Sequence, residues 1–157
     1  MTRSPQTVPA RRPLWPRILG GLAAAFVLAQ LVPYGRAHAN PPAQVQPQWQ
    51  GAQARTLFAR ACADCHSNAT KWPWYSNVAP VSWLVQQHVE EGRQKFNVNV
   101  PGFGRAADEA AGTVKDGSMP HWTYLPMHPE ARLSAAEKQS LIRGLQATFG
   151  GEGSDRD

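Results

Sequence analysis

The chain has 157 residues, with 16 lysines and arginines against 11 acidic residues, and therefore a formal charge of +5. The excess lies at one end, because residues 1–39 contain five arginines (Arg3, Arg11, Arg12, Arg17 and Arg36) and no acidic residue. The remaining 118 residues carry no net charge, which argues against a basic nucleic-acid-binding domain. They are enough for one small domain but not for a two-domain enzyme.

An apolar segment, residues 18–34, comes after four of the arginines. Its 17 residues exceed the usual signal-peptide core of about 7–15 residues and reach the lower limit for a membrane-spanning helix, roughly 17–25. Basic residues before such a segment predict export of the chain beyond it. We expect an apolar helix that anchors the domain at the periplasmic side of the inner membrane. The alternative is a soluble periplasmic protein, because Ala37-His38-Ala39 fits the pattern for signal cleavage after Ala39.

The rest of the chain predicts helices separated by loops. Residues 40–50 are rich in proline and glutamine and predict a spacer. Apolar residues at helical spacing predict helices over 53–65, from 81 to about 92, and over 106–115. Ser134-Ala135-Ala136-Glu137 is a capping box that opens a last helix, which Gly150 closes. We therefore expect an all-α domain of about four helices over residues 51–150, followed by a disordered tail, residues 151–157.

The most specific motif is Cys62-Ala63-Asp64-Cys65-His66, which reads C-x-x-C-H, the attachment signature of c-type haem. Two cysteines three positions apart at a helix end face the same way and can bond to the two vinyl groups of one porphyrin. His66 then supplies the proximal iron ligand. The motif predicts one covalent haem c, bound through Cys62 and Cys65.

Two other sites use paired cysteines. A thioredoxin-like pair comes after a strand and opens a helix, whereas this pair ends a predicted helix. A structural zinc site needs further ligands at metal spacing, and the chain has no other cysteine. Haem attachment is therefore favoured over a haem-free thiol oxidoreductase and over a zinc site.

Met119 is the favoured second iron ligand. It lies in Gly117-Ser118-Met119-Pro120, after a predicted helix, where a loop methionine can reach the far face of a haem. The other polar candidates are Met127, His88, His121 and His128. Histidine with methionine gives a higher reduction potential than two histidines, and an open site would admit gases.

Further haem contacts are expected from Trp72, Trp74 and Tyr75, which lie shortly after the motif and offer N–H and O–H donors to the haem propionates. Arg93 is a candidate for a bidentate propionate contact. Each has a simpler interpretation: the tryptophans as core residues, and Arg93 as a solvated charge at a helix end.

The chain resembles the bacterial haem-binding domain family of small monohaem c-type cytochromes over about residues 40–146. The resemblance implies an exported or membrane-anchored cytochrome c whose Met-Pro methionine, Met119, is the distal ligand. The segments that carry it are residues 40–42, 62–68, 70–76, 79–84, 88–93, 119–120, Tyr124 and 128–134.

These observations together predict one-electron transfer in the periplasm, with redox proteins at the membrane as partners and no nucleic acid. A haem-based gas or redox sensor with a displaceable distal ligand is the alternative. We expect no enzymatic activity, because a peroxidase needs acid–base groups on an open distal side.

Overall fold

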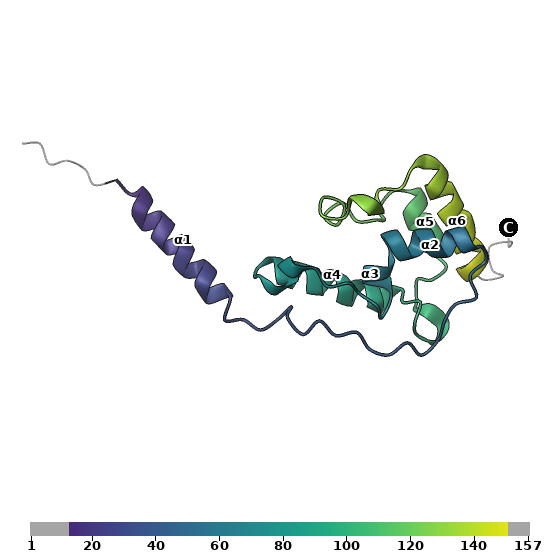
Figure 1. The fold of residues 1–157 in the computed structure, drawn as a ribbon, viewed down its shortest axis with the longest axis horizontal. Helices are drawn as coiled ribbons and strands as arrows, with labels where there is room; N and C mark the ends of the chain where they lie inside the picture. Colours follow the sequence, from purple (N-terminus) through teal and green to yellow (C-terminus); the bar gives the residue numbers. More distant parts are fainter. Residues whose placement is uncertain (1–12, 151–157) are drawn as a thin grey trace, which may run out of the picture.

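The computed structural model describes residues 13–150, and within them it contains six α-helices, three 3-10 helices and no strand (Figure 1). Arg3, Arg11 and Arg12 and the tail 151–157 lie outside the described residues. The prediction of an all-α fold is confirmed. The α-helices are α1 (Trp15–Ala29), α2 (Ala52–Ala61), α3 (Ala63–His66), α4 (Val81–Lys95), α5 (Ala110–Lys115) and α6 (Ala135–Phe149). The 3-10 helices are η1 (Trp74–Asn77), η2 (Pro101–Phe103) and η3 (Pro129–Ala131).

Helix α1 extends away from the other helices, and none of its residues is buried (Figure 1). A proline in its first turn suits the helix start, where no backbone N–H is needed. Within residues 13–150 no helix has both the length and the hydropathy required to cross a bilayer.

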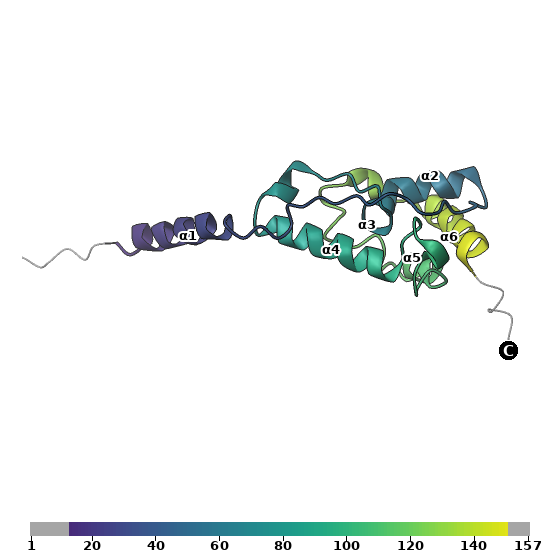
Figure 2. The ribbon, with the colours of Figure 1, turned by 90° about the horizontal axis from the view of Figure 1, so that it is seen from below.

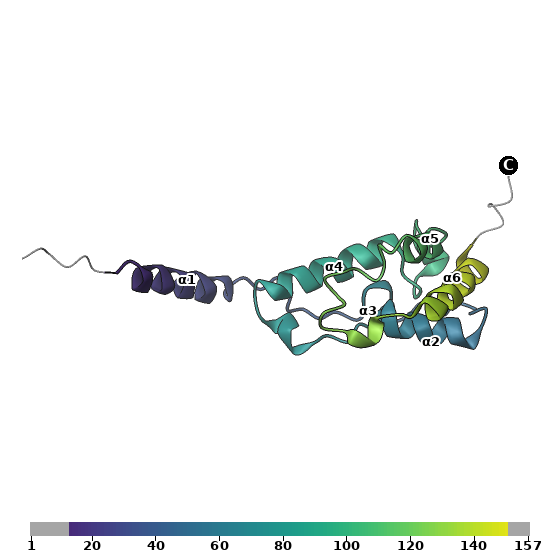
Figure 3. The ribbon, with the colours of Figure 1, turned by 90° about the horizontal axis from the view of Figure 1, so that it is seen from above.

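The core of the domain lies where α2 and α5 pack against α6 (Figure 3). Gly144 of α6 permits the closest approach, since a Cβ there would overlap the Cβ of Ala54 in α2. Phe96 joins this core from the end of α4, with its ring centroid 5.0 Å from that of Phe149. The buried apolar cluster consists of Leu57, Phe58, Phe96, Val98, Ala111, Val114, Leu141, Ile142, Leu145 and Phe149.

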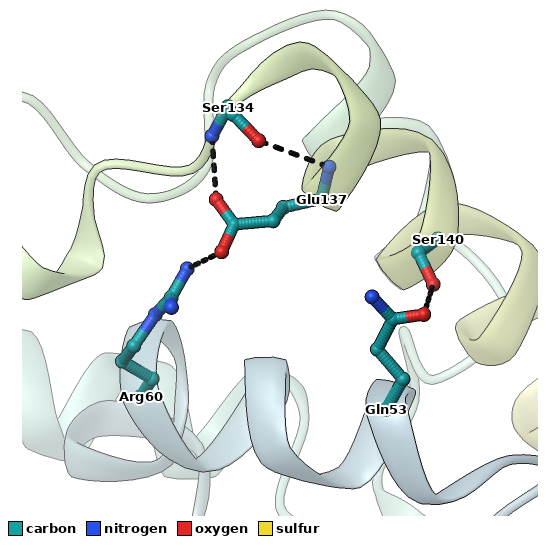
Figure 4. Close-up of polar contacts among 5 residues, drawn as sticks. All are labelled: Gln53, Arg60, Ser134, Glu137 and Ser140. Carbon is teal, nitrogen blue, oxygen red and sulfur yellow. Dashed lines mark hydrogen bonds and ion pairs between the residues drawn. The ribbon is translucent and has the colours of Figure 1, made fainter.

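The start of α6 matches its predicted capping box (Figure 4). The Ser134 hydroxyl accepts the Glu137 backbone N–H at 3.3 Å, and the Glu137 carboxylate accepts the Ser134 backbone N–H at 2.8 Å. Arg60 of α2 donates to the same carboxylate at 2.5 Å, so the cap also ties α6 to α2.

The segment expected to be a spacer is bonded to the domain. Residues 40–49, here called the strap, run along the domain surface (Figure 2). The Asn68 amide donates to the Pro42 carbonyl at 3.2 Å, and the Gln44 N–H donates to the Asn99 carbonyl at 2.9 Å. The strap ends at Trp49, whose ring lies 4.9 Å from that of Phe58. The proline-rich and glutamine-rich composition of this segment predicted a spacer. It could not show that side chains elsewhere, such as the Asn68 amide, bind the segment to the domain.

Four predicted helices differ from those observed. The apolar segment 18–34 is helical only as far as Ala29, and the helix expected to end near residue 92 continues to Lys95. The helix expected over 53–65 is interrupted at Cys62, whose φ of −130° and ψ of −31° separate α2 from α3. The helix expected over 106–115 begins only at Ala110, after a series of turns. It ends, as predicted, near Gly117, which has a positive φ of +82°.

Candidate functional site

The C-x-x-C-H motif forms one helical turn of its own. The backbone N–H groups of Cys65 and His66 both donate to the Cys62 carbonyl, at 3.2 and 3.0 Å. Both cysteines are free thiols and half-buried. The break at Cys62 therefore sets the motif apart from α2 and turns it toward α4.

Helix α4 lies directly on the motif. Gly92 is buried, and a Cβ at this position would lie 2.6 Å from the Cys65 carbonyl oxygen and 3.0 Å from its Cβ. Only a glycine allows the two backbones to come this close. The contact fixes the motif against a 15-residue helix.

His66 is held through one ring nitrogen and leaves the other available. Its Nδ1 lies 2.9 Å from the Phe96 carbonyl oxygen. Because a carbonyl can only accept a hydrogen bond, Nδ1 carries the proton and Nε2 has the lone pair. Burial lowers the pKa of His66, which also favours the neutral ring. A carbonyl acceptor of this kind is typical of histidines that bind a metal through the opposite nitrogen.

The two thiols are protonated at neutral pH in this environment. Burial raises the pKa of Cys62 to about 12 and that of Cys65 to about 11. Thiol oxidoreductases depend on a thiolate with a lowered pKa. The surroundings of this pair thus disfavour the haem-free redox alternative.

The motif opens into a cavity of about 570 Å³, within the range of small-molecule and cofactor sites. Cys62, Cys65 and His66 line it from one side, and Met119 and Tyr124 line it from the loop after α5. The apolar stripe of α4 predicted from the sequence faces this cavity: Val81, Leu84, Val85, His88 and Val89 all line it.

A second cavity, of about 520 Å³, adjoins the first. Its other walls come from Phe58 of α2, from Phe96, from α5 and the turns on either side of it, and from Leu145 of α6. The residues that line both cavities are Ala61, Cys62, His66, Lys95, Met119, Pro120 and His121. His66 and Met119 therefore lie at the junction of the two cavities.

The structure brings all the candidate second ligands to the larger cavity. Met119 is half-buried and packs against the core, and its backbone N–H donates to the Thr113 carbonyl at 3.0 Å. The rings of His88 and His121 lie 5.1 Å apart, and the ring of His128 stacks on Tyr124 at 3.8 Å. Met127 is 56% exposed. Among these candidates only Met119 and His121 line both cavities.

The aromatic residues after the motif divide into two groups. Trp74 and Tyr75 line the larger cavity. Trp72 lines neither cavity; it stacks on His38 with ring centroids 4.7 Å apart and donates to Asn40 at 3.3 Å. The structure does not bring Trp72 to the site, because the segment before the strap occupies its ring face.

Arg93 is also directed away from both cavities. Its guanidinium donates to the Ser67 carbonyl at 2.9 Å and to the Ala39 carbonyl at 2.8 Å. It also donates to Asn40 Oδ1 and to Thr70 Oγ1, each at 2.9 Å. With these four bonds the side chain holds together the strap and the loop after the motif, and it lines neither cavity.

Three groups in the site were not foreseen from the sequence. Tyr124 donates to Asp64, inside the motif, at 2.6 Å, and burial raises the pKa of Tyr124. Lys95 lines both cavities and Phe96 provides the acceptor for His66. The sequence shows that the motif contains an acidic residue, Asp64. It does not show that Tyr124, 60 residues later, is the hydrogen-bond partner of Asp64.

The residues present fit a haem with covalent and axial bonds. Two thiols and an imidazole lone pair line one mainly apolar cavity, and a thioether sulfur lies at its junction with the second. Thioether and imidazole are the ligands that cytochromes c use.

Comparison with known proteins identifies a family. The family model described as "Haem-binding domain" matches residues 24–147, which is most of the chain. No curated protein and no solved structure matches it. The chain belongs to the haem-binding domain family, and it is a haem protein.

Proposed function

We propose that this protein is a monohaem c-type cytochrome that transfers single electrons outside the cytoplasm. The observation that carries the proposal is the shared cavity lined by Cys62, Cys65, His66 and Met119. Bound haem supplies reversible one-electron exchange at its iron. We propose no conversion of a substrate.

The two cysteines hold the cofactor covalently. With haem bound, each cysteine would supply one thioether bond, its sulfur bonding to a vinyl carbon and its proton going to the neighbouring carbon. This addition transfers no electrons and would need no oxidant.

His66 and Met119 are the proposed axial ligands. The Phe96 carbonyl fixes the tautomer and the plane of the His66 ring, so that Nε2 is ready to bind iron without rearrangement. Met119 offers a soft, neutral sulfur that stabilises the ferrous state relative to a second imidazole. The cavity walls from α4 offer apolar side chains, among them Val85 and Val89, to a bound haem.

The proposed location is the periplasmic side of the inner membrane, because the apolar segment 18–34 comes after basic residues. The membrane is then reached through α1, or the protein is soluble if it is cleaved after Ala39. The proposed partners are redox proteins at the same membrane, since residues 40–157 carry no net charge to attract a polyanion.

A haem-based sensor is a second candidate function. Four residues besides Met119, namely His88, His121, Met127 and His128, line the same cavity. A site with several donors could exchange its distal ligand for a gas.

One experiment tests covalent attachment. The full chain, produced with a haem-maturation system, should retain haem in a denaturing gel, whereas the Cys62→Ser/Cys65→Ser double variant should lose it. Retention of haem by the double variant, or its loss from the unaltered chain, contradicts the proposal.

Carbon monoxide separates the two functions. The reduced protein should bind the gas slowly or not at all if Met119 occupies the iron. Rapid binding by the unaltered protein would favour the sensor.

A further inference from the structure

Residues 30–39, here called the collar, connect α1 to the strap and lie against the end of the domain formed by η1 and the start of α4 (Figure 2). Gln30 makes the most specific contact. Its Oε1 accepts the Ala79 backbone N–H at 3.0 Å, and its Nε2 donates to the Ala79 carbonyl at 2.9 Å. Ala79 is fully buried, so one side chain pairs both backbone groups of a residue that water does not reach.

The next contact is backbone against backbone. Gly35 is buried and has a φ of +85°, and a Cβ at this position would overlap the Ser82 carbonyl oxygen. Any other residue would clash with α4 and be strained. Beside it, the Tyr34 hydroxyl donates to Glu90 at 2.9 Å.

The third contact is made by His38, in the middle of the candidate cleavage sequence. Its ring stacks on Trp72, and its Nε2 lies 2.9 Å from the hydroxyl of Ser76, which is fully buried. The adjacent Ala39 carbonyl accepts from Arg93. The collar is therefore integrated into the fold at both of its ends.

Cleavage after Ala39 would remove all of these contacts. The buried backbone groups of Ala79 would lose their partner, and such groups cost free energy when left unpaired. The new N-terminal ammonium, on Asn40, would also lie beside the Arg93 guanidinium, which bonds to Asn40 Oδ1 at 2.9 Å. A second positive charge on the residue that Arg93 binds would weaken the bonds that hold the strap.

We infer that the collar is a permanent part of the folded domain, so that α1 stays attached and seats the domain against a lipid bilayer. After Arg17, α1 contains only apolar residues and glycine, and its large side chains are exposed: Leu22 is 63% exposed, Phe26 50% and Leu28 63%. A helical segment that is apolar on all sides belongs in a core or in a membrane, and no residue of α1 is buried against residues 13–150. Trp15 and Tyr34, at the two ends of the apolar segment, suit the lipid–water interface.

The first test is the mass of the mature protein. The full chain, produced in a Gram-negative host with haem maturation, is separated into membrane and soluble fractions, and the haem-staining protein is weighed intact. We expect residues 30–39 and α1 to be retained, and the protein to stay in membranes washed with sodium carbonate. A mature chain that begins at Asn40 overturns the retention, and an intact chain in the soluble fraction overturns the bilayer as its partner.

The second test measures docking of the collar by hydrogen exchange in the purified full chain. Gln30→Ala should accelerate exchange at the Ala79 amide about tenfold, which is the change expected for loss of one buried hydrogen bond of about 1.4 kcal/mol. Gln46→Ala is the matched control, because Gln46 is exposed and its side chain makes no hydrogen bond to the described part of the chain. Equal exchange in both variants would show that the collar is not docked. Neither test depends on which residue binds the iron.

Discussion

At the scale of single residues, the proposed function depends most on one sulfur atom. Met119 and His121 are separated only by Pro120, and both line both cavities. In the proposed cytochrome, a thioether and an imidazole in these positions would compete for the same iron coordination site. The two ligands would give different potentials, so the choice has a direct electrochemical consequence.

Met119→Ala should abolish the sulfur-to-iron charge-transfer band of the oxidised protein. It should also lower the reduction potential by up to a few tenths of a volt, within the roughly 0.8 V that axial ligands span. Absorption spectroscopy and voltammetry measure the two effects.

Met127→Ala is the matched control, because Met127 lines the same cavity but is 56% exposed. Its spectrum and potential should not change. Loss of the band in Met127→Ala but not in Met119→Ala would assign the ligand to Met127, and an unchanged band in both would exclude methionine ligation.

At the scale of helices, stability depends on the crossing of α2 and α6. Gly144→Ala should destabilise the protein by about 1–2 kcal/mol, because the new Cβ would overlap Ala54 and force the helices apart. Thermal or denaturant unfolding of the haem-loaded protein measures the change.

Gly112→Ala in α5 provides the opposite case. Nothing lies within 4 Å of a Cβ at this exposed position, so only the helix propensity changes. The substitution should stabilise the protein by about 0.5–1 kcal/mol. If both variants shifted stability in the same direction, close packing at Gly144 would not be the cause.

The cap of α6 gives a dependence on pH. The Ser134 backbone N–H, together with Arg60, lowers the pKa of Glu137 to about 2, below its ordinary value of 4.5. Because the folded-state pKa is the lower one, the unfolded chain binds more protons between pH 4.5 and 2. This contribution to stability is complete above pH 4.5 and is lost as the pH falls toward 2.

Glu137→Gln should therefore flatten the acid limb of the stability curve between pH 4.5 and 2, and lower stability at neutral pH. Denaturant unfolding at a series of pH values measures both. Glu109→Gln is the control, because Glu109 is exposed and forms no ion pair within residues 13–150. An equal slope in Glu137→Gln and the unaltered protein would contradict the assignment.

At the scale of the whole molecule, Arg93 joins segments that are far apart in the sequence. From α4 it bonds to the collar, to the strap and to the loop after the haem-attachment motif. A planar guanidinium can donate hydrogen bonds to four acceptors at once, whereas the ammonium group of a lysine has only three N–H donors.

Arg93→Lys should keep the charge but destabilise the protein by roughly 2 kcal/mol, as lost hydrogen bonds to a charged group do. Arg105→Lys should leave stability unchanged, since Arg105 is exposed and its side chain donates no hydrogen bond to residues 13–150. Denaturant unfolding of both variants measures the change in stability. If Arg93→Lys left the free energy of unfolding unchanged, the four hydrogen bonds of Arg93 would not be what holds these segments together.

The sequence predicted the helices and the attachment motif because both depend on short-range patterns. Apolar residues three and four positions apart indicated the last helix and the stripe on α4, and the capping box indicated the start of α6. The fixed spacing of Cys62, Cys65 and His66 likewise depends on one helical turn.

The features that the sequence did not predict depend on contacts between distant segments. Arg93 and Trp72 were expected near the cofactor, but they have partners in residues 38–40. Residues 38 and 39 belong to the candidate cleavage sequence, and residue 40 begins the predicted spacer. The break at Cys62 is another example, since it allows α3 to meet Gly92 on α4. Local propensity carries no information about such partners.

The acceptor for His66 has a consequence for how this protein tolerates mutation. The Phe96 oxygen belongs to the main chain, so no substitution at position 96 can delete it, whereas the Phe96 ring lies in the core against Phe149. Substitution of Phe96 can therefore loosen the packing against Phe149, but the main-chain carbonyl that accepts the hydrogen bond from His66 remains. The contact that orients the His66 ring is thereby protected from most single-residue changes.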